Sequence, residues 1–203
     1  MVGLRSKRAC PTLLFLGTSM SNYRRWYVAG GTYFFTLVAY RRRPIFREEI
    51  ARNCLRNAIK TIQDHRPFEL FAIVLLPDHL HCIWTLPPGD DKYPVRWKRI
   101  KEEFTINYLK AGGTDGPRSA SRKEKGERGI WQRRYWEHTV KDEDDLKRCV
   151  DYIHWNPRKH KYVDRVRDWP WSSFHRFVKL GEYDPDWGGN DPTPGFNDPE
   201  WGE

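Results

Sequence analysis

A short turn between two apolar segments constrains the fold of this chain most strongly. Residues 69–76 and 79–86 are rich in β-branched and aromatic side chains, and only Pro77 and Asp78 separate them. Proline presets the backbone for a type I turn, so this dipeptide between two strand-like segments predicts an antiparallel hairpin. The fold is therefore expected to be built around that hairpin.

Further strand and helix patterns flank the hairpin on both sides. Two segments share its β-branched and aromatic bias, and three others repeat apolar residues at helical spacing. The expected strands are residues 32–40 and 135–140, and the expected helices are residues 47–65, residues 97–108 and a segment capped by Asp142. The order β-α-β-β-α-β-α predicts an α+β, ferredoxin-like (RRM-like) fold, an antiparallel sheet with helices on one face.

Charge divides the chain into a basic part and an acidic tail. The whole chain carries a net charge of +9, but residues 181–203 hold seven acidic and no basic side chains, which leaves +16 on the rest. We therefore expect residues 1–20 to be a disordered N-terminal extension and residues 21–180 to form the domain. Residues 181–203 are expected to be an acidic Pro/Gly-rich, poorly ordered tail.

The composition also favours nucleic acid as the binding partner, because nucleic acid is a polyanion whose bases can stack on aromatic side chains. The chain has ten Trp, ten Tyr and ten Phe, and its basic residues cluster in runs. A charge run is also typical of a merely solvated face, and the basic, glycine-rich segment 111–129 is expected to be a mobile loop. The candidate DNA-contacting residues are Arg24, Arg25, Arg41, Arg42, Arg43, Arg133, Arg134, Arg158 and Lys159. No apolar run is long enough to cross a membrane, so no membrane partner is expected.

Two histidines stand directly after the turn. His79 and His81 are two apart, and residues i and i+2 of a strand point to the same face. Two imidazoles side by side on a rigid strand can bind one metal ion, whereas a solvated or hydrogen-bonded pair is the simpler alternative for so short a pattern. An HxH pair also occurs in zinc hydrolases of another kind, although no third ligand lies at short spacing.

A tyrosine and an asparagine near the end of the last helix change this balance. Tyr152 and Asn156 are four apart and share a helical face, although Pro157 disfavours helical geometry at Asn156. If this helix packs beside the histidine strand, a phenol, an amide oxygen and two imidazoles converge. That donor set suits Mg²⁺ or Mn²⁺, and Tyr152 would attack a phosphodiester. The alternative reading is a tyrosine at the edge of the core and a residue that ends the helix.

Six motifs in order resemble the REP-associated tyrosine transposases, relatives of the single-tyrosine HUH transposases. Together they span roughly residues 21 to 178. They are Asn22-Tyr23-Arg24-Arg25, Gly30-Gly31-Thr32-Tyr33-Phe34-Phe35-Thr36, Leu75-Leu76-Pro77-Asp78-His79-Leu80-His81, Trp131-Gln132-Arg133-Arg134-Tyr135-Trp136-Glu137-His138, Asp151-Tyr152-Ile153-His154-Trp155-Asn156-Pro157-Arg158-Lys159-His160, and Trp169-Pro170-Trp171-Ser172-Ser173-Phe174.

The resemblance implies a nuclease domain that cuts single-stranded DNA near palindromic hairpins. It implies that His79 and His81 bind the metal, that Tyr152 forms a 5′-phosphotyrosine and releases a 3′-hydroxyl, and that Asn156 stands where relatives place a metal-binding amide. Either His138 or His154 is a candidate for assisting proton transfer. The implied partner is hairpin or single-stranded DNA, and the protein would act as a monomer or a homodimer.

One alternative function and a location complete the expectations. A domesticated relative could bind DNA or RNA hairpins without cutting them, although intact His79, His81 and Tyr152 argue against this. The four cysteines form no CxxC pair, which favours reduced thiols and a cytoplasmic, nucleoid-associated protein.

Overall fold

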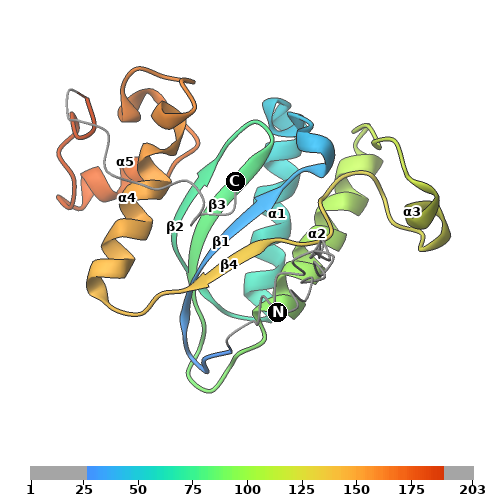
Figure 1. The fold of residues 1–203 in the computed structure, drawn as a ribbon, viewed down its shortest axis with the longest axis horizontal. Coiled ribbons are helices and arrows are strands. Elements are labelled where there is room, and N and C mark those ends of the chain that lie inside the picture. The colour runs from blue at the N-terminus through green and yellow to red at the C-terminus, as the bar shows by residue number, and fades with distance from the viewer. Residues whose placement is uncertain (1–26, 190–203) are drawn as a thin grey trace, which may run out of the picture.

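The computed structural model describes residues 27–189, and a single four-stranded sheet organises them (Figure 1). The strands are β1 (Thr32–Val38), β2 (Glu69–Leu75), β3 (His79–Thr85) and β4 (Trp136–Thr139). The helices are α1 (Glu49–His65), α2 (Tyr93–Lys110), α3 (Ala120–Glu124), α4 (Glu143–Lys159) and α5 (Phe174–Lys179). Short 3-10 turns are η1 (Tyr40–Arg42), η2 (Ile45–Arg47) and η3 (Val166–Asp168).

The sheet has the strand order β2-β3-β1-β4, and every neighbouring pair is antiparallel. The β2–β3 hairpin turns at Pro77-Asp78, and the backbone N–H of Leu76 donates to the carbonyl of His79 across it. In this register Thr36 of β1 lies opposite His81 of β3. The α+β, ferredoxin-like class expected from the order of patterns is confirmed.

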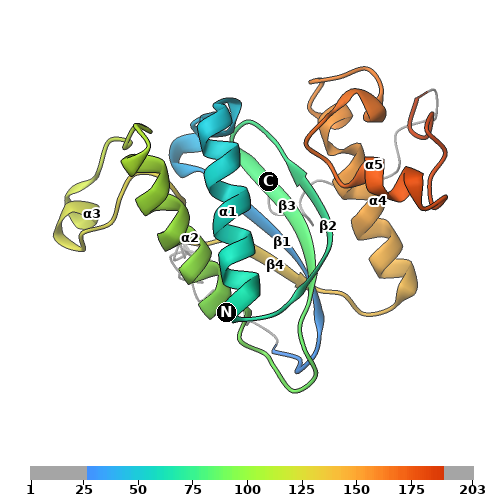
Figure 2. The ribbon, with the colours of Figure 1, turned by 180° about the vertical axis from the view of Figure 1, so that it is seen from behind.

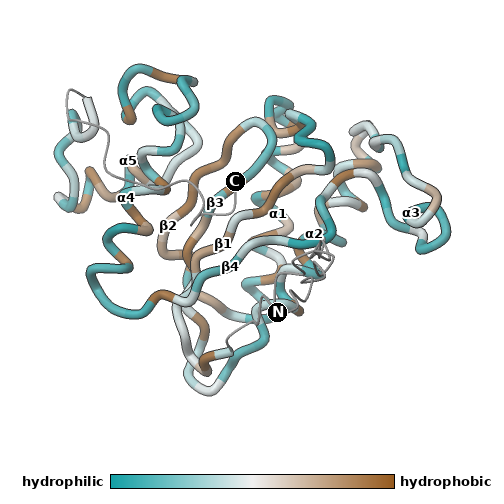
Figure 3. The backbone as a smooth tube through the Cα atoms, viewed as in Figure 1, coloured by the Kyte–Doolittle hydropathy of each residue, from teal (hydrophilic) through white to brown (hydrophobic). Residues whose placement is uncertain are grey.

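The two faces of the sheet are covered by different helices, because successive strand residues point to opposite faces. Tyr33, Phe35 and Trp84 share one core with α1 and α2, whereas Phe34 and Ile83 share a second core with α4. Figure 2 shows α1 and α2 lying across one face of the sheet, with α4 apart from them beyond β2. The expectation that all helices lie on one face is therefore corrected for α4. The strands β1 and β3 are buried on both faces along almost their whole length, and hydrophobic residues follow much of the sheet (Figure 3), so each face has a covering layer.

The helix α4 begins where the sequence predicts and extends further than expected. The Asp142 carboxylate accepts a hydrogen bond from the backbone N–H of Asp145 at 2.8 Å, and acidic residues fill the first turn. Pro157 does not end the helix, which continues to Lys159, and the backbone N–H of His160 still donates to the carbonyl of Asn156 at 3.0 Å. The last turn of α4 therefore carries side chains along the same faces as the turns before it.

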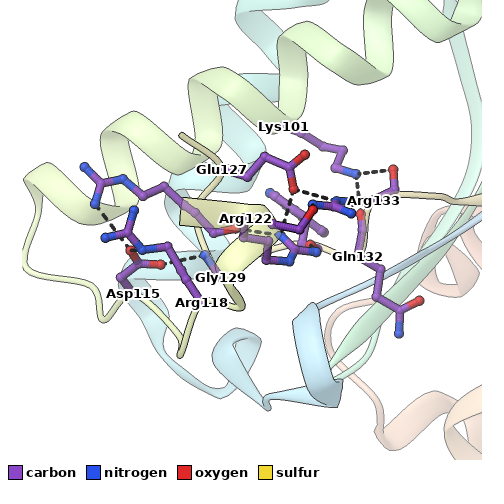
Figure 4. A network of polar contacts seen from close by, with 11 residues as sticks. Lys101, Asp115, Arg118, Arg122, Glu127, Gly129, Gln132 and Arg133 are labelled. Atoms are coloured by element: carbon purple, nitrogen blue, oxygen red, sulfur yellow. Dashed lines mark hydrogen bonds and ion pairs between the residues drawn. The ribbon is translucent and has the colours of Figure 1, made fainter. Parts of the chain in front are cut away.

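The basic segment 111–129, expected to be a mobile loop, contains α3 and is tied to the domain (Figure 4). Arg43 donates to the carbonyls of Thr114 at 2.9 Å and Gly129 at 3.1 Å. Asp115 accepts from the backbone N–H of Gly129 at 2.7 Å. A Cβ on Gly129 would lie 2.6 Å from the carbonyl oxygen of Gly116, so glycine is required where these two backbones meet.

The start of the acidic tail packs on the domain. Tyr183 donates a hydrogen bond to Asp151 of α4, and the Trp187 ring lies 6.3 Å from that of Trp155. These two aromatic side chains give residues 181–189 an apolar surface to bury, so a poorly ordered tail does not begin at residue 181. The predicted N-terminal extension, Arg24, Arg25 and the tail beyond residue 189 lie outside the described residues.

Between residues 27 and 189, no helix combines the length and the apolar character needed to cross a membrane.

Candidate active site

The two histidines of β3 point toward α4 from the floor of the site. Both His79 and His81 are buried, and their ring centroids lie 5.0 Å apart with the ring planes nearly perpendicular. The period of the strand places them on the face that α4 covers, together with Ile83. The expected juxtaposition of two imidazoles on one rigid strand is therefore observed.

Each imidazole is oriented by a hydrogen bond at Nδ1. His79 Nδ1 donates to Asp78 Oδ1 at 2.6 Å, and His81 Nδ1 lies 2.9 Å from Thr36 Oγ1. Burial alone would raise the pKa of Asp78, but its hydrogen bonds and charge contacts with His79 and Arg42 bring that pKa below its usual value. With Nδ1 engaged, Nε2 is the atom that each ring would present to a metal ion.

The helix α4 brings Tyr152 to the histidines. The Tyr152 side chain is buried, and its ring centroid lies 5.3 Å from that of His81 and 6.0 Å from that of Phe34. Lys159 Nζ donates to the Tyr152 hydroxyl at 3.0 Å. Lys159, which was expected among the DNA contacts, thus places an ammonium group on the phenol oxygen.

Asn156 and His160 extend the same side of α4 by one turn each. Asn156 is buried one turn beyond Tyr152, as the spacing predicted. His160, which caps the helix, has its ring centroid 5.3 Å from that of His79. This third imidazole was not predicted, although the spacing 152, 156, 160 is the signal that would have found it.

The donor set fits a hard divalent cation. The Nε2 atoms of His79 and His81 and the amide oxygen of Asn156 are nitrogen and oxygen donors without a thiolate, which suits Mg²⁺ or Mn²⁺ with oxygen ligands from a substrate phosphate. The carboxylate beside His79 is an outer partner that ligating histidines usually have, and the Thr36 hydroxyl takes the corresponding position beside His81. These residues would hold the ion.

The arginine run that follows β1 lies at the edge of this site. Arg41 and Arg42 both adopt the left-handed conformation, with φ of 56° and 49°. This conformation costs a non-glycine residue about 1–2 kcal/mol. Arg42 Nη1 donates to Asp78 Oδ2 at 3.3 Å, on the carboxylate that orients His79. Arg43 instead binds backbone carbonyls of the 111–129 segment.

The remaining predicted DNA contacts lie on two sides of the molecule. Arg133 and Arg134 are exposed before β4, and Arg133 pairs with Glu127 at 2.7 Å. Arg158 packs over the Trp155 ring at 4.5 Å and donates to the carbonyl of Gly188. The structure therefore does not gather all of the basic runs beside Tyr152.

A second cluster of possible metal ligands joins β4 to α4. His138, Asp145 and Cys149 offer ligand atoms within 4.8 Å of one another. The Asp145 carboxylate already accepts hydrogen bonds from His138 at 2.8 Å, from the Lys141 backbone and from Arg148. Burial raises the pKa of the Cys149 thiol well above its ordinary value, which disfavours the thiolate that a metal needs. The hydrogen bonds of this cluster are best explained as contacts that hold β4 against α4.

His154 faces away from the histidine pair. Its Nε2 lies 3.0 Å from Ser173 Oγ, and its ring packs against Phe174, Phe177 and Tyr183. Burial lowers the pKa of His154 to about 3, with repulsion from Arg176 and His175 adding to the effect. The structure thus gives both His138 and His154, the candidates for proton transfer, partners other than Tyr152.

His154 should make folding stability depend on pH. An unfolded histidine has a pKa of about 6.5, so below that value the unfolded chain binds a proton that the folded chain does not. The stability is complete above about pH 6.5 and is lost as the pH falls toward about 3. Between about pH 7 and pH 5, urea unfolding of wild type should lose about 2 kcal/mol more than that of His154→Gln. Exposed His65→Gln serves as the control, and equal losses in wild type and His154→Gln would contradict this account.

Comparisons with known proteins establish the family. The family described as "Transposase IS200 like" matches residues 27–156, which run from before β1 through Asn156. A REP-associated tyrosine transposase of Escherichia coli K12 is 44% identical over 172 residues, covering 84% of this chain and 93% of the relative. The chain belongs to the IS200-like transposases, in the group of REP-associated tyrosine transposases.

Two further relatives agree with this membership. A Haemophilus influenzae protein assigned to the same group is 46% identical over 171 residues, covering 84% of this chain and 95% of the relative. A solved structure of a REP-associated tyrosine transposase bound to a REP hairpin superposes with a TM-score of 0.68 at 41% identity, covering 88% of this chain and 98% of the other. The family resemblance stated from the sequence motifs is confirmed.

Proposed function

We propose that this transposase cuts and rejoins single-stranded DNA near palindromic, REP-like hairpins through a covalent 5′-phosphotyrosine on Tyr152. The observation that carries the proposal is the meeting of the buried Tyr152 and His81 with Lys159, whose half-buried side chain donates to the tyrosine hydroxyl. A lysine on the hydroxyl and an imidazole beside the ring are groups that can activate a tyrosine as a nucleophile, which supports a chemical role for Tyr152.

The attack would proceed from the Tyr152 hydroxyl. The phenol gives its proton to water as its oxygen forms a bond to phosphorus. The bond from phosphorus to the 3′ oxygen breaks, and that oxygen takes up a proton from water. The products are a 5′-phosphotyrosine and a free 3′-hydroxyl. A phenol is mostly protonated at neutral pH, so the Lys159 ammonium at 3.0 Å would favour the phenolate as its proton leaves. The covalent link conserves the energy of the broken bond, and attack of a 3′-hydroxyl on it rejoins the strand.

The cation site would act on the phosphate. His79, His81 and Asn156 would hold Mg²⁺ or Mn²⁺, with His160 next to His79. A divalent cation in that position supplies positive charge that polarises the phosphodiester. Asp78 and Thr36 would keep the two imidazoles in the orientation that binding requires.

The substrate, assembly and place of action follow from the site and the relatives. The solved relative is bound to a REP hairpin, which supports hairpin DNA as the substrate here. Tyr152 and the histidines all come from one chain, so a monomer would suffice for cutting, although a homodimer is compatible.

Chromosomal repeats as substrates favour a cytoplasmic, nucleoid-associated protein. The second candidate, a hairpin-binding protein without cleavage, would need no lysine on Tyr152.

One experiment tests the proposal. A hairpin oligonucleotide with a labelled single-stranded foot is incubated with the full chain and Mg²⁺ or Mn²⁺, and the products are separated under denaturing conditions. We expect a protein–DNA adduct that survives denaturation and disappears when EDTA removes the cation. Binding without any adduct would leave the non-catalytic alternative as the better account.

Lys159 should contribute to the chemical step rather than to DNA affinity. Lys159→Met should lower the single-turnover cleavage rate at saturating DNA by about 10²-fold, since it removes the charge that stabilises the developing phenolate. The control is Lys147→Met, on an exposed position of the same helix. A variant with an unchanged rate and a higher Kd would show that Lys159 only contacts DNA.

A further inference from the structure

A basic groove lies between α2 and the segment that precedes β4, away from α4. Its volume is about 680 Å³, and it is lined by six basic and two acidic side chains. Lys98 and Lys101 come from α2, whereas Lys125, Arg128 and Arg133 come from the chain after α3. Figure 4 shows Lys101, Arg122, Glu127 and Arg133 converging there.

A second, smaller hollow adjoins the groove on the side of the arginine run that follows β1. Arg122, Gln132 and Arg133 also line a smaller hollow of about 350 Å³, which reaches Tyr40 and Arg41. The next residue, Arg42, bonds the Asp78 carboxylate that orients His79. Basic side chains therefore extend from the groove to Arg41, and the adjacent Arg42 contacts the carboxylate beside His79.

The polar contacts inside the groove give it a fixed shape. Glu127 pairs with Arg122 at 3.5 Å and with Arg133 at 2.7 Å, and Lys101 donates to the carbonyl of Gln132 at 2.6 Å. The exposed rim is formed by Lys98, whose side chain is 71% exposed and lies 3.9 Å from Glu102 on the same helix, and by Lys125 on the other wall. The inner cations thus hold the walls together, and the rim offers charge to a ligand.

The groove offers little aromatic surface for base stacking. Tyr135, one of the lining residues, is half-buried and packs against Phe35 and Trp97. Trp131 is only 5% exposed, and its ring packs against Phe46 and Phe104 at 5.6 and 5.0 Å. Lys101 lies over the same ring at 6.0 Å. Proteins that bind unpaired strands without sequence preference present accessible aromatic faces, whereas duplex is held through its phosphates. The lining therefore favours a duplex over a single strand.

We propose that this groove binds the sugar-phosphate backbone of the duplex stem of the hairpin, and that Arg41 leads the strand from the foot of the stem toward His79 and Tyr152. The inference rests on the proposed function, since it names where the paired part of that substrate lies. The single-stranded foot would then be the only part of the DNA at the histidine pair.

The test compares hairpin and linear DNA on rim variants. Lys98→Gln/Lys125→Gln is measured in a Tyr152→Phe background with EDTA, by fluorescence anisotropy. The DNA is either the hairpin with its foot or the foot alone. The matched control, Lys60→Gln/Lys179→Gln, removes the same charge from exposed positions on α1 and α5. At about 100 mM salt the rim variant should bind the hairpin about tenfold more weakly, with a salt slope smaller by about two, and bind the foot alone within about twofold of the parent.

Each outcome decides the proposal. Selective loss of hairpin affinity, beyond that of the control, supports it. Equal loss for hairpin and foot would show that the groove binds unpaired strands, and a loss equal to the control would show that it binds neither. Because these measurements need no cleavage, a missing adduct with native protein would instead count against the proposed chemistry.

Discussion

Replacing Tyr152 by phenylalanine should abolish both the covalent adduct and strand cleavage. The ring keeps its packing against His81 and Phe34, so only the attacking oxygen is lost. The cleavage rate should fall by at least about 10³-fold, because the oxygen that attacks phosphorus in the proposed mechanism is removed. The free energy of unfolding should change by no more than about 1–2 kcal/mol, since one hydrogen bond to Lys159 is removed. Rates are compared in single-turnover assays with a labelled hairpin.

The matched control is a buried tyrosine in the other core. Tyr108→Phe removes a hydroxyl that donates to Glu48 at 2.8 Å, at a comparable cost in stability, and should leave cleavage intact. If Tyr152→Phe still formed the adduct at an undiminished rate, Tyr152 would not be the nucleophile. If both variants lost activity together, the loss would reflect folding rather than chemistry.

Replacing either histidine of the pair by glutamine should remove cation binding and most of the activity. His79→Gln and His81→Gln each delete a buried imidazole whose Nδ1 partner is already in place. Cleavage should fall by about 10²–10³-fold, which corresponds to several kcal/mol of charge stabilisation. Mn²⁺ affinity, measured by isothermal titration calorimetry without DNA, should fall by at least about tenfold.

The control for the histidine pair is His65→Gln, at the end of α1 in the layer on the opposite face of the sheet. It should bind Mn²⁺ and cut DNA as wild type does. Full Mn²⁺ affinity in both His79→Gln and His81→Gln would place the cation elsewhere, with the His138, Asp145 and Cys149 cluster as the first candidate to examine.

The sequence was sufficient to predict the sheet. It predicted that two histidines would meet Tyr152 only on the condition that the last helix packs beside the histidine strand. The Pro77-Asp78 turn sets the β2–β3 hairpin, and the strand period then fixes the face of His79 and His81. The Asp142 cap sets where α4 begins and hence the helical phase of Tyr152. These features depend on local chemistry, which a sequence displays directly.

The partners of Tyr152 beyond Asn156 could not be assigned, and the reason is Pro157. A proline normally interrupts a helix, so the sequence alone does not predict that residues 157–160 continue the face of the helix that carries Tyr152. Because α4 continues, Lys159 reaches the Tyr152 hydroxyl and His160 reaches His79. The left-handed backbone conformation of Arg41 and Arg42 could not be predicted either. Such a conformation is normally indicated by glycine, and neither residue is a glycine.

The most direct test of the central claim is the chemical identity of the protein–DNA link. The adduct formed with a hairpin oligonucleotide and Mn²⁺ is digested with protease and nuclease, and the modified peptide is sequenced by mass spectrometry. We predict a nucleotide joined through its 5′-phosphate to Tyr152, together with a released strand that ends in a 3′-hydroxyl. A link to another residue, or a released strand that ends in a 3′-phosphate, would contradict the mechanism.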